Sequence, residues 1–272
     1  MPQPIDLKTF NILAAAVSRR DSDIVQMASD AIEERRVVLA FQPIVNATTN
    51  SVAFYEGLAR VLEPNGRIIP AGDFMPAIDE TLVGRQLDCR ALDLGLTALR
   101  DVPGLRLAVN MSARSIGNPE WTELLESATQ ADETIAERLI LEITESSAMA
   151  VPELVAQFMS TWRSKGVCFA LDDFGAGQTA FRYFKQFQFD ILKIDGQFSR
   201  NIADDPDNQV IAKALLSIAE HFDMITVAEH IETEADAQML RALGAGYLQG
   251  YHFGIPTVTP EWDVQDDATT AV

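Results

Sequence analysis

Leu139-Ile140-Leu141-Glu142 is a short apolar run that ends in a carboxylate, and this pattern recurs along the chain. Other strand-like runs stop in the same way at Glu56, Asn110, Asp172, Lys193, Glu229 and Gln249. Counting from Glu56, the first interval between these polar residues is 54 residues and the later ones are 20 to 36 residues, which suits strand-plus-helix units. A polar residue at the end of each strand is how a (β/α)₈ barrel builds an active site on its carboxyl-terminal face. The sequence therefore predicts an α/β fold of the TIM-barrel type.

The first strand of this barrel is expected to be inverted. Two strand-like runs, Val37–Val45 and Ser51–Leu62, are joined by only five residues, and so short a link favours an antiparallel pair. Further strands are expected over 105–111, 138–143, 167–172, 189–194, 224–228 and 246–249, which makes eight. Helices are expected over 82–99, 113–130, 151–165, 178–186, 206–222 and 233–243.

The amino-terminal region has helical periodicity over residues 5–34. A polar stretch at 19–22, with Asp21 as a candidate N-cap, predicts a break between two helices there. The expected organisation is a helical extension over 1–23, a barrel domain over 24–257 and an acidic, flexible tail over 258–272.

Composition limits the function classes. The chain has 272 residues, 21 basic against 40 acidic, and a formal net charge of −19. This charge disfavours long nucleic acids and anionic lipid surfaces, whose binding relies on clustered Lys and Arg. Cys89 and Cys168 give no disulfide framework, and no apolar run approaches the roughly 18 residues that would span a bilayer. We expect a cytoplasmic protein without membrane insertion, able to take a small phosphorylated substrate if metal ions offset its charge.

The polar residues at the strand ends predict a metal site. Carboxylates that converge on one face of a barrel repel one another unless hard cations bind between them. The chain has no histidine and cysteine spacing typical of zinc, so oxygen-liganded Mg²⁺ or Mn²⁺ is favoured. Lys193 and Asp195 share one face of their strand, where a site role is favoured over a structural ion pair.

Two of these segments also allow a plainer interpretation. Asp172-Asp173, which precede Gly175 and Gly177, are also compatible with a glycine-assisted turn. Glu232, just before Thr233, would also suit a residue that only caps the following helix.

Eight motifs, in order and from about Ile24 to Pro256, resemble the EAL-domain family of cyclic-di-GMP phosphodiesterases. They are Phe41–Val45 (FQPIV), Glu56–Arg60 (EGLAR), Val109–Ser112 (VNMS), Leu141–Glu145 (LEITE), Asp172–Gly175 (DDFG), Leu192–Asp195 (LKID), Ala228–Thr233 (AEHIET) and Gln249–Tyr251 (QGY).

The resemblance implies metal-dependent hydrolysis of one phosphodiester bond of cyclic di-GMP to linear pGpG. It implies two Mg²⁺ or Mn²⁺ ions per site, with the metal ligands Glu56, Asn110, Glu142, Asp172, Asp173 and Glu229. By the same resemblance, Asp172 bridges the two ions, and Lys193 lies near the attacking water, with either Lys193 or Glu229 taking its proton. Glu145 matches the residue that anchors the Asp172–Gly175 loop. The residues implied to contact substrate or support the site are Gln42, Arg60, Asp195, Glu232 and Gln249.

The chain departs from the family pattern at three places. Gly57 replaces the alanine of Glu-Ala-Leu, Ala176–Ala180 replaces Thr-Gly-Tyr-Ser-Ser, and His230 replaces a glycine beside Glu229. In the family the second of these segments couples dimerisation to metal binding, so a homodimer is implied. Candidates for a partner-facing aromatic patch are Phe181, Tyr183, Phe184 and Phe187, with core packing as the alternative.

Two other functions remain open at this point. The altered 176–180 segment allows a catalytically silent cyclic-di-GMP receptor that acts through a regulatory protein partner. An enolase-like barrel would also use acids, a lysine and Mg²⁺, although an inverted first strand and the motif order argue against it.

Overall fold

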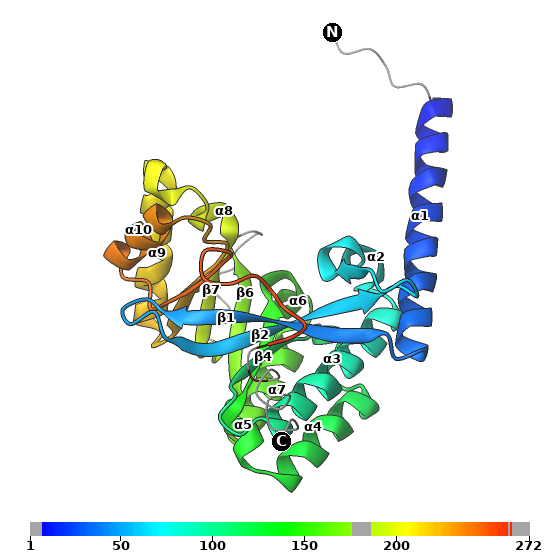
Figure 1. Cartoon of the computed structure of the whole chain (residues 1–272), viewed down its shortest axis with the longest axis horizontal. Coiled ribbons are helices and arrows are strands. Elements are labelled where there is room, and N and C mark those ends of the chain that lie inside the picture. Colours follow the sequence, from blue (N-terminus) through cyan, green and yellow to red (C-terminus); the bar gives the residue numbers. More distant parts are fainter. Residues whose placement is uncertain (1–6, 176–185, 261, 263–272) are drawn as a thin grey trace, which may run out of the picture.

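Eight strands close into a barrel in the computed structural model, which describes residues 7–175, 186–260 and 262 (Figure 1). The barrel strands are β1 (Val37–Asn46), β2 (Val52–Leu62), β4 (Leu107–Asn110), β5 (Leu139–Thr144), β6 (Cys168–Phe174), β7 (Ile191–Ile194), β8 (Ile225–Ala228) and β9 (Tyr247–Gln249). β1 pairs antiparallel with both β2 and β9, and each of the remaining neighbours pairs parallel. The predicted TIM-like barrel with an inverted first strand is confirmed.

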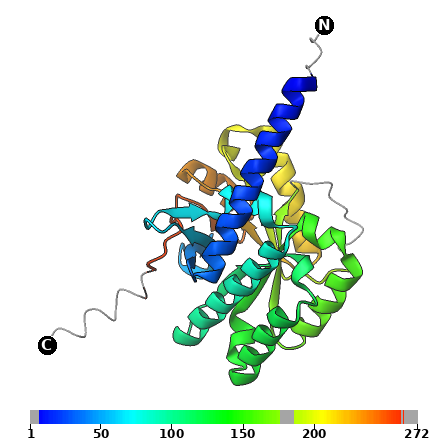
Figure 2. The ribbon, with the colours of Figure 1, turned by 90° about the vertical axis from the view of Figure 1, so that its right-hand side faces the viewer.

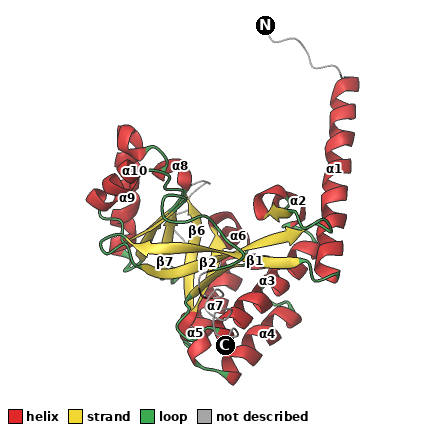
Figure 3. Ribbon diagram, viewed as in Figure 1, coloured by secondary structure: helices red, strands yellow, loops and turns green. Residues whose placement is uncertain are grey.

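Helices alternate with these strands and surround the barrel (Figure 3). They are α1 (Leu7–Glu33), α2 (Met75–Ile78), α3 (Leu82–Asp101), α4 (Pro119–Ala131), α5 (Thr134–Arg138), α6 (Glu145–Ala150), α7 (Pro152–Arg163), α8 (Gly196–Ser199), α9 (Pro206–His221) and α10 (Glu234–Leu243). The 3₁₀ turns within the described residues include η1 (Ala71–Asp73), η2 (Ala113–Ser115) and η4 (Ile202–Asp204). The main core lies between helices and barrel wall, where Leu139, Leu141 and Ile143 of β5 pack with residues such as Trp121 of α4.

The amino-terminal helix differs from the sequence expectation. The predicted break at 19–22 is wrong, because α1 is one helix over Leu7–Glu33. Residues 19–23 are exposed, so their polar side chains stay in solvent and do not interrupt the helix. The first half of α1 extends away from the barrel, while its second half packs Ala28 and Ala31 into a smaller core with β1, β2, α2 and α3 (Figure 2).

The short helices α2, α5, α6 and α8 and one strand were not predicted, and one predicted helix lies outside the described residues. A ninth strand, β3 (Ile68–Pro70), pairs with the outer part of β2. The predicted helix 178–186 falls almost wholly on 176–185, outside the described residues, together with Phe181, Tyr183 and Phe184. Phe187 is described and is 6% exposed, with its ring 5.5 Å from that of Phe189, so this residue belongs to the core.

The barrel interior has an apolar floor to which every strand contributes one side chain. Its members are Ile44, Phe54, Ala108, Ile140, Ala170, Ile191 and Val227, with Tyr247 packed against them. Side chains two residues apart on a strand share a face. The next inward position on each strand therefore lies above this floor, toward the carboxyl-terminal mouth. On the inverted strand β1 that position is two residues earlier, at Gln42.

Candidate active site

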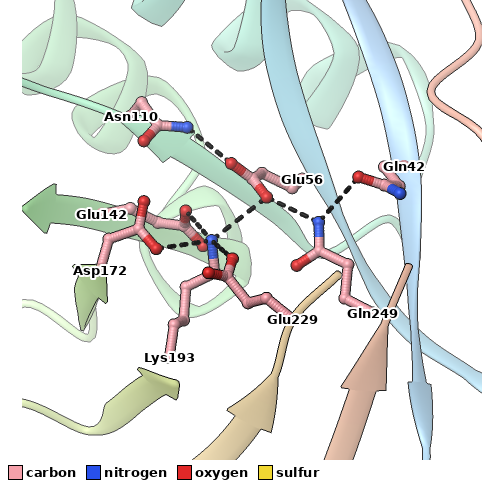
Figure 4. Close-up of polar contacts among 8 residues, drawn as sticks. All are labelled: Gln42, Glu56, Asn110, Glu142, Asp172, Lys193, Glu229 and Gln249. Atoms are coloured by element: carbon pink, nitrogen blue, oxygen red, sulfur yellow. Dashed lines mark hydrogen bonds and ion pairs between the residues drawn. The ribbon is translucent and has the colours of Figure 1, made fainter. Parts of the chain in front are cut away.

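Eight polar side chains, one per barrel strand, meet above the apolar floor (Figure 4). They are Gln42, Glu56, Asn110, Glu142, Asp172, Lys193, Glu229 and Gln249. Each follows a floor residue by two positions, or precedes it by two on β1, so strand alternation directs them inward, and Glu229 continues this alternation one residue past the end of β8. These residues are distant in sequence, and the closed sheet brings them together.

Lys193 lies at the centre of this group. Its Nζ is 2.8 Å from Glu142 Oε2 and 2.9 Å from Glu229 Oε1. The same Nζ is 3.0 Å from Asp172 Oδ1 and 3.2 Å from Glu56 Oε2. Lys193 is 1% exposed and all four acids are buried. One ammonium therefore faces four carboxyl groups. If all four were ionised, these five side chains would together carry a large net negative charge.

Amides fix the orientation of Glu56. Asn110 Nδ2 donates to Glu56 Oε1 at 2.8 Å, and Gln249 Nε2 donates to Glu56 Oε2 at 2.7 Å. Gln249 Nε2 also donates to Gln42 Oε1 at 3.1 Å, and Gln42 Nε2 donates to the carbonyl of Gly254 at 3.0 Å. This network holds Glu56 in place from the β1 and β9 side of the barrel.

The buried carboxylates differ strongly in pKa. Burial alone would raise the pKa of Glu56, but the charge of Lys193 and the hydrogen bonds from Gln249 and Asn110 lower it to about 2. Burial and the neighbouring carboxylates raise the pKa of Glu142 and of Glu229 well above the ordinary value. Burial opposes the charge of Lys193, but the four acids outweigh it and raise its pKa well above the ordinary value. The site thus accumulates more acid than one lysine can neutralise.

Two overlapping groups of acids have the spacing of metal ligands. In the first, ligand oxygens of Glu56, Glu142 and Asp172 lie within 4.8 Å of one another. In the second, the same limit holds for Asp172, Asp173 and Glu229, so Asp172 belongs to both. Glu142 Oε1 is buried without a hydrogen-bond partner, which is a costly arrangement for a carboxylate oxygen. Hard cations would satisfy this oxygen and offset the negative excess, so the donor set fits Mg²⁺ or Mn²⁺.

An irregularity near the end of β6, between Leu171 and Phe174, brings Asp173 into the second group. Asp173 and Gly175 have φ of 54° and 96°, in the left-handed region, which bends the chain at the strand end. Burial, with the charges of Asp172 and Asp195, raises the pKa of Asp173 to about 6. Glu145, the first residue of α6, accepts a hydrogen bond from the Gly175 N–H at 3.2 Å and is 4% exposed. Its side chain therefore ties α6 to the turn after β6.

A cavity of about 740 Å³ opens from the acids toward solvent. This volume lies within the usual range for small-molecule sites. Two arginines, Arg60 and Arg200, line it together with His230, Glu232 and the exposed Tyr251. Arg200 Nε lies 3.4 Å from Glu232 Oε1. The cavity thus connects the acidic side chains above the apolar floor with a rim that carries arginines and an aromatic ring.

A family model described as "EAL domain" matches residues 25–256 of the chain. The chain belongs to the EAL-domain family. Among curated relatives, this EAL domain is 31% identical over 231 residues to "Bifunctional diguanylate cyclase/cyclic di-GMP phosphodiesterase MucR" of Pseudomonas aeruginosa. It is 29% identical over 238 residues to "Cyclic di-GMP phosphodiesterase PdeB" of Shewanella oneidensis. The matches cover 83% and 84% of this chain but only 34% and 27% of the relatives, so the chain spans about a third of their length or less.

Solved structures agree with this assignment. The EAL domain superposes with a TM-score of 0.76 and 29% identity on the MucR phosphodiesterase of Pseudomonas aeruginosa in complex with c-di-GMP, over 89% of this chain and 99% of that one. It superposes with a TM-score of 0.79 and 25% identity on the FimX EAL domain of Pseudomonas aeruginosa bound to c-di-GMP, over 87% and 97% of the two chains.

The EAL domain places most of the predicted site residues together and three of them apart. Asp195 caps α8, with Oδ1 accepting from the Gln197 N–H at 2.8 Å, and Glu232 lies on the cavity rim with a 54% exposed side chain. Glu145 contacts the turn after β6 and is not one of the four acids around Lys193. Asp195 was expected to share a face with Lys193, but β7 ends at Ile194 and Asp195 is the N-cap of α8. Glu145 was expected from the resemblance to anchor the Asp172–Gly175 loop, and its contact is with Gly175 of that loop.

Arg200 and Asp88 are among the cavity residues of the EAL domain that were not predicted from the sequence. Arg200 carries no strand-end signal, since it follows the short helix α8. Asp88 lies on α3 among the buried positions Leu87, Leu92 and Leu96. An acid on the core-facing side of an amphipathic helix is the signal that would have found it.

Among the helices that the structure describes, none has the length and apolar character needed to cross a membrane.

Proposed function

We propose that this EAL domain hydrolyses one phosphodiester bond of cyclic di-GMP and releases linear pGpG, using Mg²⁺ or Mn²⁺. The observation that carries the proposal is the pair of acid triads that share Asp172 beside Lys193, at the base of an open cavity. Relatives named as cyclic di-GMP phosphodiesterases and the c-di-GMP complex of MucR supply the substrate.

The metal ligands would come from both triads. Glu56, Asn110, Glu142 and Asp172 would hold one ion, and Asp172, Asp173 and Glu229 would hold the second. A pair of divalent ions in such a site supplies a water of lowered pKa and Lewis-acid stabilisation of the attacking and leaving oxygens.

The chain's own residues would handle the proton of the attacking water. Its oxygen forms a new bond to phosphorus, the bond between phosphorus and the 3′ oxygen breaks, and that oxygen takes up a proton to leave a 3′ hydroxyl. Lys193 Nζ and Glu229 Oε1 are 2.9 Å apart. Because Lys193 is an ammonium with a raised pKa, we propose that Glu229 takes the proton of the water and that Lys193 holds the Glu229 carboxylate in place.

Other side chains would bind and orient the substrate. A substrate with two phosphates needs cations in a chain whose net charge is −19. Arg60 lies on the cavity wall and would supply such a cation. Gln42 and Gln249, which hold Glu56 in place, also line the cavity and would orient the substrate through their amides. We propose Asp195 and Glu232 as supporting groups at the cavity edge, and Glu145 as the anchor of the β6 turn.

The test is turnover of cyclic di-GMP by the purified chain, followed by separation of nucleotides. We expect pGpG to appear with Mg²⁺ or Mn²⁺ and not with a chelator. Tight nucleotide binding in chelator, with the nucleotide unchanged after long incubation with either metal, would instead favour the receptor function. Folded protein that neither binds nor cleaves cyclic di-GMP would refute both.

We propose in addition that the chain forms a homodimer and responds to a regulatory protein partner in the cytoplasm. The family resemblance and the composition support these points. The segment that the resemblance links to dimerisation, 176–185, lies outside the described residues. Light scattering across a concentration series, with and without Mn²⁺, measures the oligomeric state directly.

A further inference from the structure

Asp88 is a buried carboxylate whose two hydrogen bonds both go to one turn. It is 7% exposed and projects from α3 toward the loop that follows β4. Its Oδ2 accepts from the Ser112 N–H at 2.9 Å and from the Ser115 hydroxyl at 2.6 Å. Asp88 and Ser112 also line the active-site cavity. The carboxylate therefore fixes both ends of η2, the 3₁₀ turn directly behind the site.

Among the described residues, no cation forms an ion pair with Asp88. Desolvation raises the pKa of Asp88 to about 7, its two hydrogen bonds oppose that rise, and the neighbouring carboxylate Asp79 adds to it. A buried acid without an opposite charge lowers the stability of a fold unless hydrogen bonds compensate. A polar group kept at such a position is a candidate for a role in function.

The turn held by Asp88 begins next to a proposed metal ligand. Asn110 ends β4, the Met111 N–H donates to the carbonyl of Glu142 at 2.9 Å, and Ser112 is the first residue bound to Asp88. The Ser147 hydroxyl accepts from the Ala113 N–H at 2.8 Å on the far side of the turn. Asp88 thus holds the chain two residues after Asn110, at the point where it leaves β4.

We propose that Asp88 is a positioning residue that holds the Ser112–Ser115 turn and thereby keeps the side-chain amide of Asn110 at the metal-binding acids. The proposal rests on the metal site of the proposed function. Asp88, on helix α3, would thus orient Asn110, one of the eight polar side chains that the barrel strands contribute to the site.

The test measures Mn²⁺ binding directly, by titration of the full chain with the paramagnetic resonance signal of free Mn²⁺ as readout. We expect Asp88→Ala to weaken Mn²⁺ binding by about 10- to 100-fold, the usual range for loss of a group that orients a metal ligand. Asp88→Asn keeps an oxygen acceptor for both donors and should retain affinity close to that of the unchanged chain. Ser115→Ala removes one of the two bonds and should fall between them.

Asp190→Ala is the matched control. Asp190 accepts a backbone N–H from Phe169 at 2.9 Å and an Arg163 guanidinium N–H at 2.7 Å, at the opposite end of the barrel. Its loss removes a comparable pair of bonds without touching the turn after β4, so Mn²⁺ affinity should not change. Each variant is compared at a temperature where circular dichroism shows it folded.

Several outcomes would overturn the proposal. Folded Asp88→Ala with unchanged Mn²⁺ affinity, Asp88→Asn as weak as Asp88→Ala, or an equal loss in Asp190→Ala would each do so. If Asp88→Ala does not fold, Ser115→Ala and Asp88→Asn decide the question, since both keep a polar group at position 88. Mn²⁺ binding without any turnover would refute the proposed hydrolase alone, whereas turnover with no effect of these substitutions would refute the positioning role alone.

Discussion

The interior of the barrel has two levels that differ in chemistry and share the same strands. The lower level is the apolar floor, with Ile140 of β5 as a typical member at 7% exposed. The upper level begins two residues later, where Glu142 is 1% exposed and lies 2.8 Å from Lys193 Nζ. One step of strand alternation separates a residue that packs from a residue with a buried, unpartnered oxygen.

The difference shows where this fold gains stability and where it gives some up. Burial of apolar side chains on the floor favours folding, at roughly 25 cal/mol per Å² of surface removed from water. Burial of several acids around one lysine opposes folding in the absence of cations. Sites that bind ligands commonly accept such a loss of stability. Substitutions at the two levels should therefore have opposite consequences for activity and stability.

The largest expected effect is on the upper level, with Glu142→Gln. This change keeps the shape of the side chain and removes one carboxylate from the first triad, so turnover of cyclic di-GMP should fall by more than about 100-fold. The free energy of unfolding in chelator should not decrease, because a buried acid that resists ionisation is replaced by a neutral amide. Nucleotide separation and denaturant unfolding measure the two quantities. Turnover near that of the unchanged chain would remove Glu142 from the metal site.

The counterpart on the lower level is Ile140→Ala, on the same strand. Removing most of this side chain from the floor should lower the free energy of unfolding by about 2–5 kcal/mol. The rate per folded molecule should stay near that of the unchanged chain, because the upper level is two residues away. Urea unfolding and turnover below the unfolding transition are the measurements. A severe loss of activity in folded Ile140→Ala would mean that the two levels are not separable.

Both levels were predictable from the sequence because strand alternation and strand ends are local patterns. Elsewhere, local reasoning failed where one element gives way to the next. It placed Asp195 on one face with Lys193 by continuing a strand that in fact stops one residue earlier, at Ile194. It interpreted the polar 19–22 stretch as a break, although polar residues on an exposed face leave helix α1 intact.

Asp88 was missed for a different reason. Its partners Ser112 and Ser115 are 24 and 27 residues away, and only the packing of α3 against the loop after β4 brings them together. A pattern within one helix can show that a charge lies on the buried face, but not which donors meet it. The acids of the upper level were found more easily, since each one carries its own strand-end signal.

The contrast between the levels should sharpen with pH when metal is absent. The pKa of Glu142 and of Glu229 is raised well above 4.5 and that of Asp173 to about 6, so the folded chain holds protons that the unfolded chain releases. Stability in chelator should therefore fall as pH rises from about 4.5 through 6 and beyond. Glu56, whose pKa is lowered to about 2, acts in the opposite direction, and its contribution is lost only as pH falls from 4.5 toward 2.

Mn²⁺ should remove most of this decline, because ligation replaces protons on the same oxygens. Asp88, with a pKa raised to about 7, should keep its own share of the decline when Mn²⁺ is bound. Thermal unfolding between pH 5 and 8, with chelator or Mn²⁺, measures both effects. Stability in chelator that increases over this range would contradict the described charge arrangement.

The smallest expected effect lies just above the upper level, at His230. This residue has φ of 57°, which is unfavourable for a side chain with a Cβ, and its ring packs so closely on Gly196 that a Cβ there would lie 2.6 Å from His230 Cγ. His230→Gly should raise the free energy of unfolding by no more than about 1 kcal/mol, since relief of backbone strain is offset by greater chain entropy in the unfolded state. His230→Asn is the control, because asparagine accepts this backbone conformation but leaves the ring contact with Gly196 unmade. If both substitutions lower the free energy of unfolding equally, the ring contact outweighs the backbone strain. If only His230→Gly changes KM for cyclic di-GMP while kcat stays constant, a side chain at position 230 contributes to substrate binding and not to the chemical step.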